Sequence, residues 1–86
     1  MRYIKIECNE LLKQFQILLN VEESIALSWY FDDEERYLNV ELLKYYNDLS
    51  ISFRISYDEL KQSVMSKYKL LELYLKKKII MLENFP

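Results

Sequence analysis

The amino-acid sequence predicts a two-layer α+β domain in the order α-β-β-β-α, with a three-stranded antiparallel meander packed against an N-terminal helix and a long C-terminal helix. Three observations support this prediction. Apolar residues recur at helical spacing near both ends of the chain, they alternate with polar residues in its middle, and the alternating segments are joined by short connections. A chain of 86 residues is expected to form one domain, residues 1–86.

The stretch "NELLKQFQILLN", residues 9–20, predicts the N-terminal helix, with Asn9 as its N-cap. Residues 3–8 fit two structures: an extra strand, because apolar and polar residues alternate there, or an extension of the helix through Ile4 and Cys8. We favour the helix, with both helices on one face of the sheet. The side chains expected in the core are Leu11, Leu12, Phe15, Leu18 and Leu19.

Two strands are predicted from the alternation in "SIALSWYF", residues 24–31, and in "LSISFRIS", residues 49–56. Between them, "RYLNVELLKYY", residues 36–46, fits both a strand, through Leu38, Val40 and Leu42, and a helix, through Leu38, Leu42 and Tyr45. We favour the strand, because "DDEE" and "YYND" are then short connections of the kind that a meander needs.

The C-terminal helix is predicted from a capping box, in which Ser56 is the N-cap and Glu59 the third helical residue. Residues 57 to about 83 then contain neither Gly nor Pro, which predicts a single helix of ~40 Å at 1.5 Å per residue. Its expected core face consists of Tyr57, Leu60, Val64, Tyr68, Leu71, Leu75 and Leu82.

The composition argues against catalysis. The chain has no His and no Gly, so catalytic triads, zinc sites and glycine-dependent phosphate loops are not expected. Its single cysteine, Cys8, is expected to be a buried apolar residue. We therefore predict a non-enzymatic protein with no cofactor, no metal and no small-molecule substrate. No apolar run has the length of a membrane span, and a cytoplasmic location is expected, in the host cell if a phage encodes the chain.

Charge is distributed unevenly along the chain. Residues 1–60 carry a net charge of −6 and residues 61–86 one of +4, within a total of −2. The stretch "WYFDDEERY" concentrates four carboxylates in one connection. A solvated hairpin turn is the simpler interpretation, and the alternative is a surface that attracts a nucleic-acid-binding protein with a basic groove. The candidate partner-binding residues there are Tyr30, Asp32, Asp33, Glu34, Glu35 and Tyr37.

From residue 70 onward the C-terminal segment is apolar nearly all round. The residues outside its predicted core face are Leu70, Leu73, Tyr74, Ile80 and Met81. They would be covered either by the N-terminal helix, or by a protein partner or a second copy in a homodimer.

These observations favour a small protein-interaction domain, and we expect an inhibitor that blocks a protein or a nucleoprotein complex. The composition, free of Gly and rich in Ile, Lys, Tyr, Asn and Glu, resembles that of small phage and plasmid proteins, among which anti-CRISPR proteins act in this way. The alternative is a small nucleic-acid-binding or regulatory dimer that uses the basic C-terminal helix.

Overall fold

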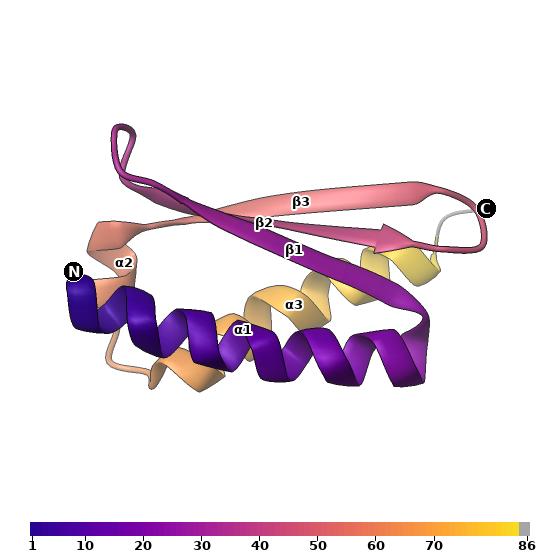
Figure 1. Cartoon of the computed structure of the whole chain (residues 1–86), viewed down its shortest axis with the longest axis horizontal. Coiled ribbons are helices and arrows are strands. Elements are labelled where there is room, and N and C mark those ends of the chain that lie inside the picture. Colours follow the sequence, from indigo (N-terminus) through magenta and orange to yellow (C-terminus); the bar gives the residue numbers. More distant parts are fainter. Residues whose placement is uncertain (85–86) are drawn as a thin grey trace.

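The computed structural model describes residues 1–84 and confirms the α+β class (Figure 1). The elements are α1 (Arg2–Glu23), β1 (Ile25–Asp32), β2 (Tyr37–Lys44), β3 (Leu49–Ser56), α2 (Tyr57–Gln62) and α3 (Lys67–Glu83). The strands form one antiparallel sheet in the order β1-β2-β3, and the helices form a second layer against one face of it. Among the described residues, no helix is both long enough and apolar enough to cross a membrane.

Helix α1 includes residues 3–8, which confirms the helical interpretation of that segment. The predicted N-cap is wrong, because the helix begins at Arg2 and Asn9 lies inside it. The buried stripe consists of Cys8, Leu12, Phe15 and Leu19, so the burial of Cys8 is also confirmed. Leu18, predicted in the core, is 50% exposed because it lies beside the buried stripe and not in it.

The register of the sheet explains which residues enter the core. Leu27 on β1 lies opposite Leu42 on β2, and Leu42 lies opposite Ile51 on β3. Because side chains alternate between the two faces of a strand, these three side chains face the helices. The cross-strand neighbours that include Val40 and Leu38 of β2 face the same way. The contested residues 36–46 contain β2, and the strand prediction is confirmed there.

The C-terminal segment is not one helix, and this part of the prediction is wrong. Helix α2 ends at Gln62, and α3 begins after Ser66. The hydroxyl of Ser63 accepts the backbone N–H of Met65 at 3.1 Å, and that of Ser66 accepts the N–H of Lys69 at 3.2 Å. Serine hydroxyls offer the backbone an alternative to helical bonds, so two of them three residues apart favour a break.

The break changes which residues face the core. Val64, predicted in the core, lies in the connection and is fully exposed, and Tyr68 is 41% exposed. The prediction is confirmed for the other five residues, which are all buried: Tyr57, Leu60, Leu71, Leu75 and Leu82. Four unwound residues separate α2 from α3, so one helical wheel cannot describe both.

Three residues that are not glycine adopt positive φ: Ser24 at 54°, Arg36 at 63° and Asp48 at 54°. Ser24 ends α1, while Arg36 and Asp48 lie in the two turns of the meander. These are positions where glycine is usual, because a Cβ atom disfavours the left-handed conformation. The chain has no Gly, so other side chains adopt it at all three.

Candidate protein-interaction surfaces

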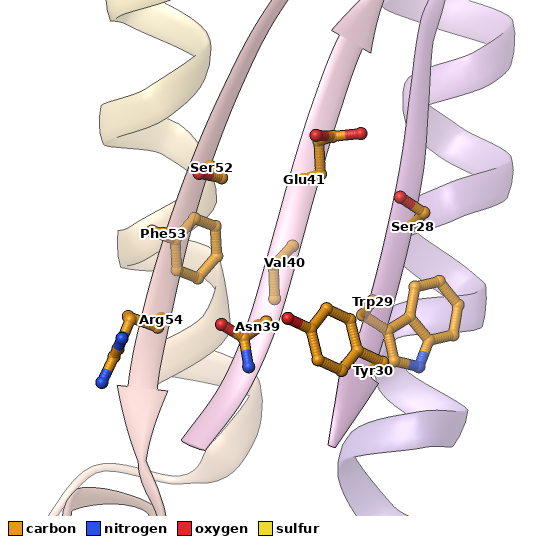
Figure 2. Close-up of a pocket in the computed structure, with 9 residues that line it drawn as sticks. All are labelled: Ser28, Trp29, Tyr30, Asn39, Val40, Glu41, Ser52, Phe53 and Arg54. Atoms are coloured by element: carbon orange, nitrogen blue, oxygen red, sulfur yellow. The ribbon is translucent and has the colours of Figure 1, made fainter. Parts of the chain in front are cut away.

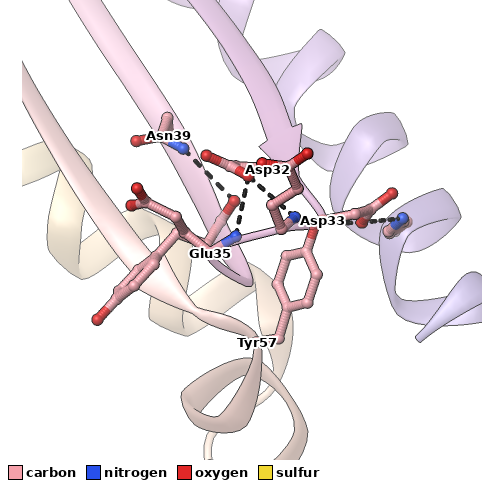
Figure 3. Close-up of polar contacts among 8 residues, drawn as sticks. Asp32, Asp33, Glu35, Asn39 and Tyr57 are labelled. Atoms are coloured by element: carbon pink, nitrogen blue, oxygen red, sulfur yellow. Dashed lines mark hydrogen bonds and ion pairs between the residues drawn. The ribbon is translucent and has the colours of Figure 1, made fainter.

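The acidic connection between β1 and β2 is held by its own side chains (Figure 3). One carboxylate oxygen of Asp32 accepts the backbone N–H groups of Glu34 and Glu35, both at 3.0 Å. An aspartate at the start of a turn commonly satisfies the following backbone donors in this way. Asp32 therefore has a structural task, and its position before a turn is a signal that sequence reasoning could have used.

Asp33 links the acidic connection between β1 and β2 to helices α1 and α2. Its carboxylate accepts the phenol of Tyr57 at 2.6 Å and lies 2.5 Å from the Lys5 ammonium group. The hydrogen bond from Lys5, followed by that from Tyr57, lowers the pKa of Asp33. Burial, together with the hydrogen bond to Asp33, raises the pKa of Tyr57 to about 12. Lys5 lies on α1, 28 positions from Asp33, and no local pattern in the sequence indicated this contact.

Glu35 also has a basic neighbour. Its carboxylate lies 3.6 Å from the guanidinium group of Arg54, which itself stacks 3.6 Å from the centre of the Tyr37 ring. Three of the four carboxylates thus contact other groups of the chain, and within residues 1–84 only Glu34 makes no such contact through its carboxylate. The negative potential of the tip is reduced accordingly.

The sheet face opposite the helices is open, and a shallow depression of about 500 Å³ lies over it (Figure 2). Tyr30 stands there beside Asn39, and it is 63% exposed. The polar side chains that line the depression are Ser28, Tyr30, Asn39, Glu41, Ser52 and Arg54. Among the described residues, no group of three or more His, Cys, Asp or Glu is arranged to hold a metal ion.

The apolar flank predicted on the C-terminal helix is divided by the structure. Leu70 is 5% exposed and belongs to the core, so it is not available to a partner. The Tyr74 ring stacks on Phe53 of β3 with centroids 5.2 Å apart, and its hydroxyl donates to Glu59 at 2.9 Å. Burial and that hydrogen bond raise the pKa of Tyr74. The residues that remain exposed are Leu73, Ile80 and Met81.

Helices α1 and α3 enclose an apolar groove of about 380 Å³, which we call the helix groove. Leu18, Leu19, Ile79 and Ile80 contribute its apolar surface. Its charged residues are Glu22, Glu23, Lys76 and Glu83. Ile80 was predicted at an exposed flank, whereas Leu18 was predicted in the core, because the exact rotation of α1 about its axis depends on packing. The lining residues belong to the C-terminal parts of α1 and α3, which lie at the end of the domain opposite the acidic connection between β1 and β2 (Figure 1).

The basic residues of α3 do not gather into one site. Glu72 lies between Lys69 and Lys76, with nitrogen–oxygen distances of 3.4 and 4.0 Å. The Lys78 ammonium group lies 3.9 Å from the sulfur of Met81. A phosphate-binding surface needs several unpaired cations on one face, and Glu72 pairs with two of the five lysines of α3.

Comparisons of this chain with protein-family models, with curated proteins and with solved structures found no match. The geometry of its surfaces is therefore the basis of the functional argument.

Proposed function

We propose that this chain is a non-catalytic protein-interaction domain that acts as an inhibitor, and that the helix groove is its binding site. The single observation that carries the proposal is the exposed apolar surface of that groove. Ile80 is 58% exposed and Leu18 50% exposed, and both line the same concave surface. Apolar side chains that are exposed together in a groove are typical of binding sites rather than of ordinary surface.

The shape of the site favours an amphipathic helix as the bound segment. Two helices side by side present a groove into which a third helix can place apolar residues at spacings of three and four. The exposed side chains of Val21 on α1 and Leu73 on α3 extend the apolar surface beyond the groove itself. A helix that occupies the groove would be unavailable to its usual partner, which is how a small domain inhibits without turnover.

Charge favours a basic segment. The groove has three carboxylates, on Glu22, Glu23 and Glu83, and one ammonium group, on Lys76. The local excess of two negative charges would attract an amphipathic helix that carries Lys or Arg beside its apolar stripe. The acidic hairpin lies at the far end of the domain, so it would contribute only through the long-range field and not through contact.

Synthetic amphipathic helical peptides test the proposal. Three peptides share one apolar stripe and carry Lys, Gln or Glu beside it, and fluorescence anisotropy measures their affinities. We expect the order Lys, then Gln, then Glu, with the difference decreasing as salt is added. Ile80→Glu should abolish binding. Ile6→Glu is the matched control, because Ile6 is 53% exposed on α1 and lies outside the groove.

Equal affinities for the three peptides, or equal effects of Ile80→Glu and Ile6→Glu, would contradict the proposal. Nucleic-acid binding through α3, the alternative function, predicts a different result. It would require retardation of DNA or RNA at low salt that Lys77→Gln weakens and Ile80→Glu leaves unchanged.

A further inference from the structure

The two edges of the sheet differ in how they are covered. In an antiparallel strand, the N–H and C=O of one residue point to the same side, and successive residues alternate. The Gln16 side chain on α1 donates to the carbonyl of Leu27 at 2.9 Å, so the backbone of Leu27 points away from β2. Asn9 on the same helix accepts the indole N–H of Trp29 at 2.9 Å. Helix α1 therefore lies along β1, and its Gln16 side chain bonds one of the backbone groups on the outer edge of that strand.

The outer edge of β3 has no such contact within the part of the chain that the structure describes. Because Leu27 points outward, the even-numbered residues of β1 bond to β2, and their partners there are the odd-numbered residues of β2. The backbone groups of Leu38, Val40 and Leu42 therefore bond to the odd-numbered residues of β3. The backbone groups of Ser50, Ser52 and Arg54 consequently point outward. Within residues 1–84, no group outside the strand forms a hydrogen bond with them.

This edge also lacks the usual protection. Natural proteins block an exposed edge with Pro, Lys or a bulge, because unpaired backbone groups otherwise bind another strand. The β3 sequence, "LSISFRIS", has no Pro and no Lys, and it pairs with β2 residue by residue without a bulge. The side chains of Ser50, Ser52 and Arg54 are exposed, and two of the three are small.

We propose that β3 pairs antiparallel with β3 of a second copy, about a two-fold axis at Ser52, to form a six-stranded sheet. In this register Ser52 lies opposite Ser52, and Ser50 lies opposite Arg54 of the other copy. Arg54 then has Asp48 of the other copy at a diagonal position. Centring the axis on Phe53 instead would place the two Arg54 residues at diagonal positions, roughly 7–8 Å apart, where like charges repel.

The helix layer provides an apolar contact beneath the same edge. The Tyr74 ring stacks on Phe53 of β3, so this side of α3 lies under that strand. Met81 follows Tyr74 by seven residues, which is close to two helical turns, and therefore lies on the same side. Met81 is exposed, and Leu49 and Ile51 on the lower face of β3 are only partly buried. A second copy would cover these side chains, which a backbone ladder alone would not.

Cysteine cross-linking tests the pairing and its register. Residues directly opposite in an antiparallel pair have Cα atoms roughly 5.5 Å apart, within the range of a disulfide. Ser52→Cys should therefore form a covalent dimer under mild oxidation, read on non-reducing gels. Ser28→Cys is the matched control: an exposed serine on the same face, but on β1. Cys8 is fully buried, and burial raises its pKa to about 11, so it should not compete.

Sedimentation of the unmodified protein provides the second measurement. Ser52→Pro removes only an outward N–H, so the monomer should stay folded and the dimer should dissociate. If that variant does not fold, Ser52→Lys serves instead, because it sets two ammonium groups opposite each other. Ile80→Glu should leave the dimer intact, which separates this interface from the helix groove.

Three results would overturn the proposal. One is a wild-type protein that sediments at 10.6 kDa over the whole range of concentrations in which it stays soluble. Another is equal cross-linking of Ser52→Cys and Ser28→Cys. The last is a folded Ser52→Lys variant that dimerises as the wild type does.

Discussion

Leu71 and Val64 provide a sharp test of the break between α2 and α3. The helical wheel of an unbroken helix places both residues on one buried face. In the structure Leu71 is 0% exposed, whereas Val64 is fully exposed in the connection. Replacing each by Ala therefore distinguishes one helix from two.

The expected magnitude follows from burial. Removing a buried Leu side chain loses ~1.5–3 kcal/mol of transfer free energy, and the cavity left behind raises the cost to ~2–5 kcal/mol. A domain of this length has a free energy of unfolding of roughly 4–13 kcal/mol, so Leu71→Ala removes a large share of it. Val64→Ala removes no buried contact and should change stability by less than about 0.5 kcal/mol.

Urea unfolding followed by tryptophan fluorescence measures both effects. Trp29 is the only Trp, and its indole is hydrogen-bonded to Asn9 on α1, so its emission reports the contact between sheet and helix. The midpoint of Leu71→Ala should fall markedly at an unchanged slope, while that of Val64→Ala stays near the wild type. Similar losses of stability in the two variants would refute the break and support a single unbroken helix.

Three further predictions concern single residues. Folding lowers the pKa of Asp33 from 3.8, so its ionised carboxylate should stabilise the protein above pH 3.8. This contribution should be lost as the pH falls through the pKa of the folded state, and Asp33→Asn should flatten this part of a pH–stability curve. Because the pKa of Tyr57 is raised from 10.0 to about 12, its contribution should be lost as the pH rises through that interval, and Tyr57→Phe should remove this dependence. Ser24→Gly should raise the free energy of unfolding by about 1 kcal/mol, measured by thermal or urea unfolding, because Gly adopts positive φ without a Cβ clash. A loss of stability would show instead that the Ser24 side chain stabilises the fold by more than its backbone strain costs.

The sequence by itself determined the sheet and most of the core. Alternation in residues 24–31 and 49–56 decides which face of each strand is buried, because a slip of one residue would expose every apolar side chain. The apolar stripe of Leu12, Phe15 and Leu19 likewise indicates which side of α1 is buried, although it does not separate the neighbouring Leu18 from the core. Such patterns are local and repeat over several turns or residue pairs, so they can be read without knowing what lies opposite.

The tertiary structure alone decided where the C-terminal helix breaks and which surfaces remain open. Residues 57–83 contain no strong helix breaker, and the serine hydroxyls at 63 and 66 favour a break only weakly by themselves. The break lets α2 bury Leu60 at one end of the core while α3 turns to pack beneath β3 and β2. The same packing brings Lys5 to Asp33 and places Leu18 and Ile80 in one groove. These contacts join residues far apart in the chain, and their geometry depends on how the helices settle against the sheet, which no local pattern of residues specifies.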